Sequence, residues 1–335
     1  MISTYKNEGV FHMKKSIAII LCMTLLLTAL LAGCGSKPLK FGAGVYVSAP
    51  SATDATVDKN GAGKVDVTVA AVTVDADGKI ASCALDTASN SVEYTADGKA
   101  VAKEGFKTKY ELGKDYNMVA YGGATKEWFE QVDAFEALVA GKTLDEVKAL
   151  VVNGDKGTDE VLKAGCTITI SEFVAAIEKA YNNATESKVT AKDTLKVTVA
   201  TEQTVADATE EKDGSNKVAT YVFAAAVNAE GKVVAGKSDC VEVSFTFDAA
   251  GASTFDATKA VLSKREQGTN YGMVAYGGSA KEWFEQADAF DAACVGKTGS
   301  EIAGLVASDG KGVADLQSAG CTIYVTGFVK AASKI

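Results

Sequence analysis

Hydrophobic and polar residues alternate in two pairs of segments along the chain. The first pair lies in "GKVDVTVAAVTVDADGKIASCALD" (63–86) and the second in "NKVATYVFAAAVNAEGKVVAGKSDCVEV" (216–243). Within each pair the two alternating runs are separated by Asp-Gly-Lys or Glu-Gly-Lys. A period of two is typical of strands, and a glycine turn between two such runs predicts a β-hairpin. We therefore expect one hairpin to turn at Gly78 and another at Gly231.

A helical period follows each predicted hairpin. In "TKEWFEQVDAFEALVAG" (125–141) the apolar residues Trp128, Val132, Phe135 and Val139 fall on one face of a helix. Their spacing favours a buried helix face over a set of flavin-stacking rings. Thr125 is the expected N-cap of this helix, and a glycine is expected to end it.

Further elements complete each pattern. Thr143–Glu146 and Thr298–Glu301 have the spacing of capping boxes, which predict short second helices. A glycine-rich loop follows in both places. The stretches "CTITI" and "CTIYV" then alternate like strands, and each leads into a last helix-like run such as "SEFVAAIEKA".

The whole pattern occurs twice. Residues 116–143 align without a gap with residues 271–298, and the match continues to the two Ala-Gly-Cys-Thr stretches at 164–167 and 319–322. A period of about 155 residues is far too long for a solenoid and indicates a duplicated domain. We predict an α+β fold with two duplicated domains, 35–185 and 186–335. Each is expected to be a small, mainly antiparallel sheet packed with about three helices.

The N-terminal segment has the features of an export signal. Residues 13–37 begin with two lysines, continue with an apolar run and end in small residues. The sequence Leu31-Ala32-Gly33-Cys34 resembles the lipobox of bacterial lipoproteins, which implies that residues 1–34 end at a diacylated Cys34. The implied location is the outer face of the cytoplasmic membrane, with the lipid as anchor. An uncleaved span is the alternative, but a span needs about 20 apolar residues. Either Met1 or Met13 is the start.

Composition removes several classes of function. The formal charge of −9 disfavours a nucleic-acid partner. His12, before the signal, is the only histidine, so a Ser-His-Asp triad, a Cys-His pair and a histidine-bound metal are excluded from the mature chain. Arg265 is the only arginine, which excludes an arginine cluster around a phosphate. A hydrolase would need a carboxylate pair, and Glu127, Glu130 and Asp133 have the spacing of a solvated helix face.

The repeated glycine-threonine motif carries a family resemblance. Both halves resemble the FMN-binding domain of Rnf-type and sodium-pumping NADH:quinone reductase subunits, in which a "DGKI" hairpin precedes Ser-Gly-Ala-Thr-x-Thr-Ser and an alanine-rich helix. The first half has "DGKI" at 77–80 and matches the motif at Gly165, Thr167 and Thr169. The second half keeps Gly320 and Thr322. The motif's serines and its alanine are replaced in both halves.

The resemblance implies a cofactor and partners. In that family the first threonine carries FMN through a phosphoester bond, which would fall on Thr167 and Thr322 here. The implied partners are a flavin transferase and a redox protein. FMN binding is expected to be covalent or non-covalent.

The cysteines allow more than one interpretation. Cys83 and Cys240 lie in equivalent predicted strands, and Cys166 and Cys321 lie in equivalent motifs. In an exported protein such repeated pairs suggest the disulfides Cys83–Cys166 and Cys240–Cys321. The alternatives are small buried core residues, or reduced thiol pairs near a flavin. Cys294 replaces Val139 of the first half and is expected to fill the core.

Two functions therefore compete. The first is a cell-surface lipoprotein that binds FMN and takes part in extracytoplasmic electron transfer. The second is a surface binding or adhesion lipoprotein that keeps the fold without a cofactor and meets a peptide, a sugar or a wall polymer. Both hypotheses describe an electron carrier or a binding protein rather than an enzyme.

Overall fold

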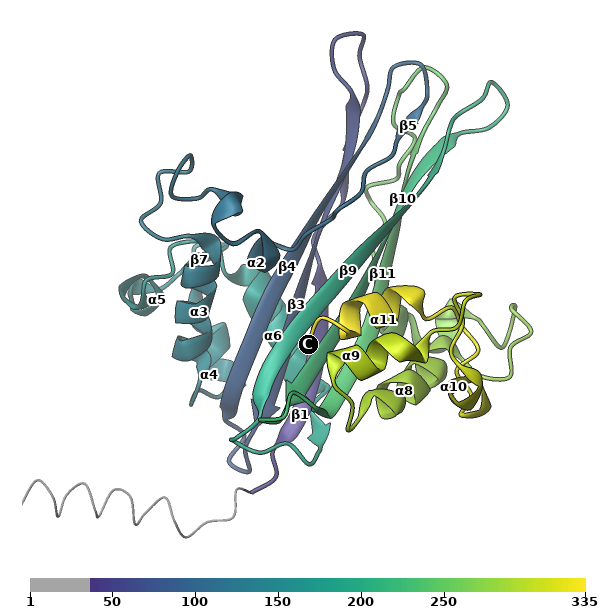
Figure 1. Cartoon of the computed structure of the whole chain (residues 1–335). Helices are drawn as coiled ribbons and strands as arrows, with labels where there is room; N and C mark the ends of the chain where they lie inside the picture. The colour runs from purple at the N-terminus through teal and green to yellow at the C-terminus, as the bar shows by residue number, and fades with distance from the viewer. Residues whose placement is uncertain (1–36) are drawn as a thin grey trace, which may run out of the picture. The chain divides into compact units, whose positions relative to one another are not determined.

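The computed structural model describes residues 37–335, of which Pro38–Ile335 form one compact unit. The predicted signal, its lipobox and Cys34 lie outside the described residues. The unit combines antiparallel sheets with helices (Figure 1), so the predicted α+β class is confirmed.

The first half builds a sheet around one long hairpin. β3 and β4 pair along their whole length, and the turn between them contains Gly78 at a φ of +76°, a left-handed conformation that favours glycine. The predicted hairpin is confirmed. The sheet order is β5-β4-β3-β1-β8, with β2 added beside β3. The strands are β1 (Lys40–Val47), β2 (Ser51–Thr53), β3 (Gly61–Val74), β4 (Ile80–Tyr94), β5 (Ala100–Val101) and β8 (Thr185–Glu186).

The second half repeats this plan with fewer strands. β10 and β11 form the second predicted hairpin, which turns at Gly231 with a φ of +73°. β9 pairs with β10 as β1 pairs with β3, so the sheet order is β11-β10-β9. The strands are β9 (Thr194–Ala206), β10 (Gly214–Val227) and β11 (Val233–Phe247).

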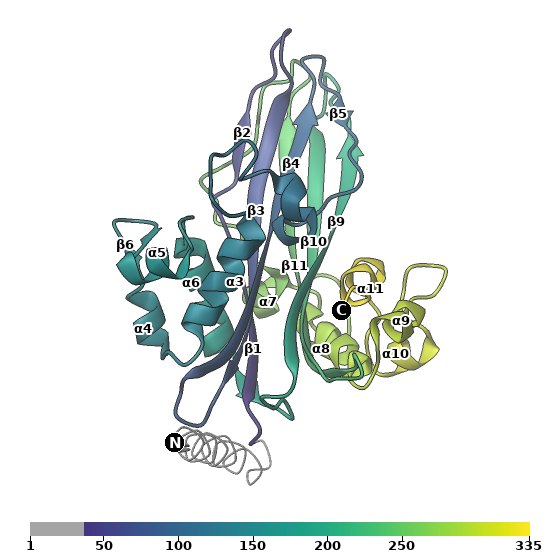
Figure 2. The same ribbon diagram turned by 60° about the vertical axis from the view of Figure 1, so that its left-hand side comes forward.

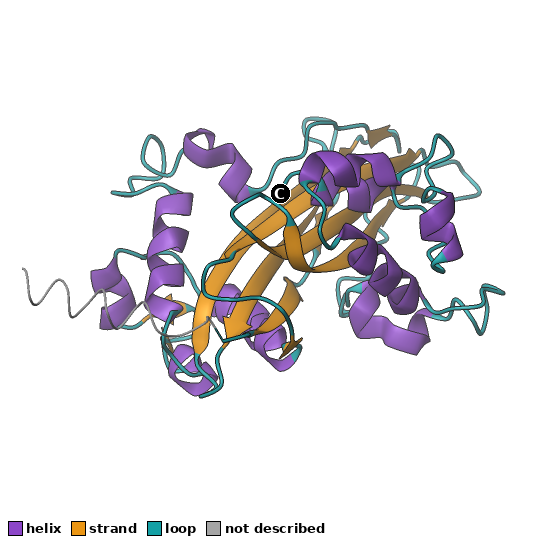
Figure 3. Cartoon of the chain, turned by 60° about the horizontal axis from the view of Figure 1, so that its bottom comes forward, coloured by secondary structure: helices purple, strands orange, loops and turns teal. Residues whose placement is uncertain are grey.

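The two sheets pack face to face, and the helices cover the two outer faces. In Figures 1 and 2 most helices of the first half and most of those of the second half lie on opposite sides of the paired sheets, and Figure 3 shows helices on both sides of the strands. Valines from both halves fill most of the space between the sheets and are buried there. The members of this inner core include Val45, Val65, Val67, Val69, Val199, Val218, Val222, Val241 and Val243.

The longest helices lie against the outer faces as their sequence pattern predicts. Trp128, Val132, Phe135 and Val139 of α3 are all buried in the first half's outer core. In the second half Cys294 is buried in the equivalent place, so its role as core filler is confirmed. The long helices are α3 (Trp128–Val139), α6 (Ser171–Asn182), α8 (Trp283–Cys294) and α11 (Thr326–Ala332).

The predicted capping boxes are confirmed, whereas the predicted N-cap of α3 is wrong. The boxes at Thr143–Glu146 and Thr298–Glu301 both form and start α4 (Leu144–Lys148) and α9 (Gly299–Ile302). Thr125, however, does not cap α3. Glu127 occupies the N-cap and exchanges hydrogen bonds with Glu130. Glu127 is buried rather than solvated, which corrects the expectation of an exposed face at that position.

The predicted strands "CTITI" and "CTIYV" are also wrong. Residues 166–170 form a non-sheet connection, because Cys166 and Ile170 insert into the core while the backbone bonds to nearby loops and to a helix end. The glycine-rich loop before this segment contains extra elements instead. The remaining elements are α2 (Lys109–Leu112), η1 (Gly113–Tyr116), β6 (Val151–Val152), β7 (Lys156–Gly157), α5 (Asp159–Ala164), α7 (Lys264–Gln267), η2 (Gly268–Tyr271), η3 (Ala303–Leu305) and α10 (Ala314–Ser318).

Contacts between the halves occur in equivalent pairs. Lys179 of the first half forms an ion pair with Glu266, and Lys334 of the second half binds Glu111 with Nζ 2.6 Å from Oε1. Tyr94 also stacks on its counterpart Phe247 with ring centroids 4.3 Å apart. Such reciprocal contacts are the pattern of a two-fold interface, here formed within one chain.

Candidate functional site

The predicted motif residues lie where α5 and α10 end. Gly165 and Gly320 have φ values of +101° and +100°, and a Cβ at either position would collide with the ammonium group of Lys126 or Lys281. Both positions favour glycine because of the left-handed backbone conformation, while the lysine side chain could move aside. This local geometry explains why the glycine occurs in both halves.

The threonine that follows is tied to the long helix beside it. Gln131 Oε1 accepts hydrogen bonds from both the N–H and the hydroxyl of Thr167, at 2.8 and 2.9 Å. Gln286 binds Thr322 with the same two distances. The glutamines are buried, whereas the threonine side chains are exposed. A substituent on the hydroxyl would thus reach solvent and leave the buried glutamine oxygen its N–H partner.

Thr322 also lines a cavity of about 810 Å³ in the second half. This volume is in the range of roughly 300–1,000 Å³ found for small-molecule pockets. Gly320 lies two residues from Thr322, at the end of α10. Aromatic residues from several elements line the cavity. They are Tyr221 in β10, Tyr271 in η2, Tyr276 in the loop after η2, Trp283 at the start of α8, Tyr324 just before α11 and Phe328 in α11.

Two of these rings stand in solvent. Tyr276 is 92% exposed and Tyr324 is 68% exposed, whereas Trp283 is buried by its helix face. Large aromatic surfaces left open beside a cavity mark a place where a ligand or partner gains apolar contact. Trp128, at the equivalent position in the first half, is likewise a core residue, as its helical spacing predicts.

Two lysines supply positive charge to this cavity. Lys264 Nζ lies 4.9 Å from the ring centroid of Tyr271 and 3.2 Å from Glu242. Lys311 Nζ lies 5.9 Å from the centroid of Tyr324. Neither lysine was predicted as a site residue from the sequence. The signal that could have found Lys264 is its repetition, since Lys109 occupies the same place before the first half's tyrosine.

The first half preserves part of this arrangement. Lys109 Nζ lies 5.8 Å from both Tyr116 and Trp128, close to the arrangement of Lys264 with its two rings. Thr167 belongs to this half's motif, and Thr169 is exposed two residues before the start of α6. The second half has the exposed Tyr324 at the position of Thr169.

Another exchange enlarges the aromatic wall of the second half. Tyr221 in β10 packs over Gly327, where any Cβ would collide with the tyrosine ring. At the equivalent positions the first half has Thr68 and Glu172, whose side chains lie 3.4 Å apart. Burial raises the pKa of Glu172. The Tyr221 ring thus lies over the helix position that carries the Glu172 carboxylate in the first half.

The cysteines of the described residues are all free thiols in the structure. The pairs Cys83–Cys166 and Cys240–Cys321 are therefore not bonded there. Burial raises the pKa of Cys166 and Cys321 to about 11, so both thiols are protonated at neutral pH. Their burial matches the alternative of small core residues.

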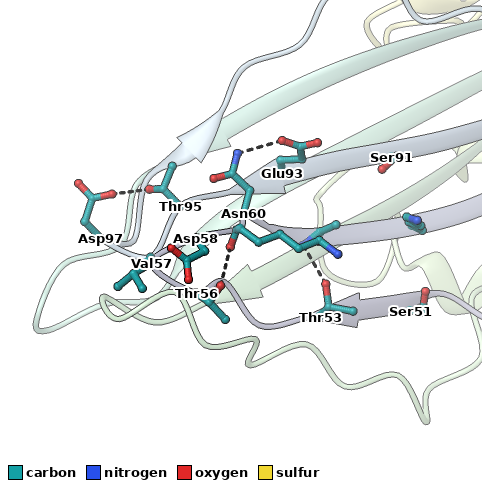
Figure 4. A pocket seen from close by; sticks show the side chains of 14 residues that line it. Ser51, Thr53, Thr56, Val57, Asp58, Asn60, Ser91, Glu93, Thr95 and Asp97 are labelled. Carbon is teal, nitrogen blue, oxygen red and sulfur yellow. Dashed lines mark hydrogen bonds between the residues drawn. The ribbon is translucent and has the colours of Figure 1, made fainter.

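A second concave surface lies at the hairpin tips of the first sheet. It encloses about 1,080 Å³ between β2, β3 and β4 (Figure 4) and has a mainly polar lining. Asn60 Nδ2 donates to Glu93 at 3.0 Å across it, and Val57 at its rim is 94% exposed. No described group of acidic, cysteine or histidine side chains here or elsewhere in residues 37–335 is arranged to hold a metal ion.

Comparisons with known proteins add no family: no family model, no curated protein and no solved structure matches this chain. Within residues 37–335, none of the helices has both the length and the apolar character needed to cross a membrane.

Proposed function

We propose that the chain is a lipid-anchored surface flavoprotein that binds FMN in the cavity beside Thr322 and carries electrons outside the membrane. The observation that carries this proposal is the set of exposed tyrosines around a cavity that also holds the threonine of the motif. Tyr276 and Tyr324 would cover a flat heteroaromatic ring system, which gains from stacking. The cofactor, when bound, supplies one- and two-electron redox chemistry.

The residues present fit the phosphate end of FMN in charge. Lys311 borders the cavity and supplies positive charge in the absence of an arginine cluster, whereas the charge of Lys264 is paired with Glu242, which also lines the cavity. Thr322 offers an exposed hydroxyl for covalent attachment by a flavin transferase. Thr167 offers the same hydroxyl in the first half, with the same glutamine behind it. The apolar walls exclude water from one side of the ring system.

The first experiment is a visible spectrum and an intact mass of the chain from Gly35 onward, prepared with and without a co-expressed flavin transferase. We expect absorbance near ~450 nm, the usual flavin band, and an added mass of one or two FMN units. Thr167→Val and Thr322→Val should each remove one unit if attachment is covalent. A colourless protein of unmodified mass, also after incubation with free FMN, would overturn the proposal.

A matched pair of variants separates binding from attachment. Tyr324→Ala and Tyr276→Ala should weaken non-covalent FMN binding without changing unfolding, because both rings are exposed. Val57→Ala, at the distant hairpin tip, serves as the control. Equal binding by all three variants would place FMN elsewhere.

The proposed anchor has its own test. The variant Cys34→Ser should move the protein from the membrane fraction to the soluble fraction and abolish incorporation of labelled palmitate. Retention in the membrane without lipid would favour an uncleaved span instead.

The polar hollow in Figure 4 favours a second candidate function, cofactor-free binding of a sugar or wall polymer. Its hydroxyl, amide and carboxylate groups are those that recognise carbohydrate hydroxyls. Titration with soluble wall fragments would support this function if Asn60→Ala and Glu93→Gln weaken binding. Unchanged binding by these variants would exclude the hollow.

A further inference from the structure

Two clefts lie at equivalent places between the halves. One, of about 420 Å³, separates β4 and α3 from β9, and its lining includes Asp86, Tyr110 and Glu136. The other, of about 370 Å³, lies between β11 and β1, and its lining includes Asp239 and Arg265. Residues of the first-half cleft and the second-half cleft can be compared one by one, because the repeat aligns them.

In both clefts the carboxylate on the long helix accepts the same backbone hydrogen bond from the neighbouring strand. Glu136 Oε1 accepts a hydrogen bond of 2.6 Å from the backbone N–H of Leu85. Its counterpart Asp291 accepts one of 2.8 Å from the N–H of Ser238. In each half, therefore, a carboxylate on the long helix is fixed against the edge of the sheet.

The strand carboxylates are also equivalent. Asp86 Oδ1 accepts from the N–H groups of Thr87 and Tyr110 at 2.7 and 3.2 Å. Asp239 Oδ1 accepts from the N–H groups of Cys240 and Arg265 at 2.8 and 3.1 Å. Both aspartates are buried. The frame of two carboxylates is therefore the same in the two halves.

The cation that belongs to this frame is present in only one half. Arg265 donates to Asp288 Oδ1 at 2.9 Å and to Asp291 Oδ2 at 2.7 Å, and it also binds the carbonyl of Ser238. Lys237 adds a second positive charge 2.8 Å from Asp288.

The first half has Tyr110 at the position of Arg265 and Ala84 at that of Lys237. The Tyr110 hydroxyl donates to Asp133 Oδ1 at 2.7 Å. Among the described residues, no lysine or arginine forms an ion pair with Asp86 or Glu136. The half-buried Glu136 and the exposed Asp133 are thus left without the guanidinium that pairs with their counterparts Asp291 and Asp288, whereas the buried Asp86, like Asp239, is held by backbone N–H groups.

The pKa values of these carboxyl groups follow from the presence or absence of the guanidinium. Burial raises the pKa of Glu136 to about 8 and that of Asp86 to about 7. In the second half burial raises the pKa of Asp291 only to about 6, because the Arg265 guanidinium opposes the effect. Charged carboxylates in a poorly hydrated place are costly without a cation.

We propose that the first-half cleft binds a small organic cation with a guanidinium or primary ammonium group on an apolar stem, and that this cation occupies the role that Arg265 has in the second half. Glu136 binds the charged head as Asp291 binds the guanidinium, and the buried Asp86 adds negative charge in the same cleft. The ring of Tyr110 offers its face to the cation. Leu195 and Val197 of β9 line the cleft and contact the stem. This site is independent of the proposed flavin cavity.

Other charged groups surround the cleft and define its net charge. Asp133 on α3 adds a negative charge beside Tyr110. Lys334 lines the cleft, but its ammonium group binds Glu111 and the carbonyl of Val199, at 2.6 and 2.5 Å. Lys196 on β9 is exposed at the edge. With Lys334 paired to Glu111, the carboxylates of Glu136, Asp86 and Asp133 outnumber the one remaining lysine, so the ionised cleft favours a cation and accommodates one with two positive charges.

Calorimetric titration of the chain from Gly35 onward with agmatine tests the proposal, with neutral pentylurea and 1,5-diaminopentane as comparison probes. We expect agmatine or the diamine to bind at pH 8 and pentylurea not to bind. Glu136→Gln should weaken binding at least tenfold, while Asp145→Asn, an exposed acid on α4, should leave it unchanged. Affinity should rise from pH 6 to pH 9 as the carboxyls ionise.

A second variant keeps the proposal falsifiable if Glu136→Gln perturbs the fold. Tyr110→Arg supplies the missing guanidinium within the chain, so it should abolish agmatine binding and raise the unfolding temperature. Agmatine binding that survives both Tyr110→Arg and Glu136→Gln, or no binding of either cation at millimolar concentration, would overturn the proposal.

Discussion

In the second half of the chain, Arg265 bridges Asp288 and Asp291 and a lysine lies beside them. In the first half the same backbone bonds hold the carboxylates, but Tyr110 occupies the position of the arginine. The positions of the carboxylates therefore do not depend on the presence of the positive charge that neutralises them. Backbone N–H groups fix where the carboxylates lie, and the Arg265 guanidinium opposes the rise that burial causes in the pKa of the helix carboxylate Asp291. The repeat provides an internal control, because each side of the comparison has a counterpart to mutate.

The largest effect is expected from Arg265→Ala. Removal of the guanidinium leaves Asp291 buried without its main partner, and breaking such a pair costs about 3–5 kcal/mol. The loss should shrink at pH 5, where Asp291 is protonated. Urea unfolding at pH 7.5 and pH 5 measures both values. An equal loss at both pH values would show that Arg265 acts through packing alone.

A smaller, pH-dependent effect is expected from Glu136→Gln. The folded-state pKa of Glu136, about 8, lies above its ordinary value of 4.5, so the folded state binds more protons than the unfolded chain between these values. The free energy of unfolding therefore falls as pH rises through that window. Glutamine imitates the protonated form and should remove roughly 1–3 kcal/mol of this fall.

Unfolding curves of the wild type and Glu136→Gln at pH 5 and pH 8.5 provide the measurement. Asp291→Asn is the matched variant in the second half. It should destabilise near neutral pH instead, because it removes a partner of Arg265. The same response from both variants would contradict the difference between the halves.

A comparable loss, equal in the two halves, is expected where the sheets meet. A Cβ at Gly61 would collide with Tyr94, and one at Gly214 would collide with Phe247. Overpacking of this kind costs about 1–3 kcal/mol. Gly61→Ala and Gly214→Ala should lower the unfolding temperature by similar amounts. Markedly unequal shifts in the unfolding temperature would show that Tyr94 and Phe247 do not pack in equivalent surroundings.

The smallest effect is expected from the reciprocal ion pairs. Glu111→Gln and Glu266→Gln each remove the partner of a half-exposed lysine, which costs about 0.5 kcal/mol. The two losses should be equal and additive in the double variant, and both should decrease in 1 M salt. Strong coupling in the double variant would indicate that the two contacts form together.

Local elements could be predicted from the sequence because their causes are local. The hairpins follow from a period of two and a glycine turn, and α3 follows from the spacing of Trp128, Val132 and Phe135. The alternation in "CTITI" gave a false strand, since Cys166 and Ile170 are buried without a neighbouring strand to pair with. Five alternating residues do not specify a sheet partner.

The arrangement of the sheets depends on contacts distant in sequence. A clue was present in "VAAVTV" of β3, where apolar residues are continuous rather than alternating, which is typical of a strand covered on both faces. For the candidate site, the glycine and threonine were found from the motif. The lysines and the carboxylates were missed because only the fold brings β4, α2 and α3 together. Asp86 and Asp239, repeated inside strands, were the available signal.

The valine-rich surface shared by the sheets has a consequence for synthesis. A chain that has been made only as far as β8 presents Val65, Val67 and Val69 to water, because the strands that cover them follow later. Until β9–β11 emerge, such an intermediate resembles one subunit of a two-fold dimer that lacks its mate. A fragment cut at residue 190 should therefore assemble with a second copy of itself.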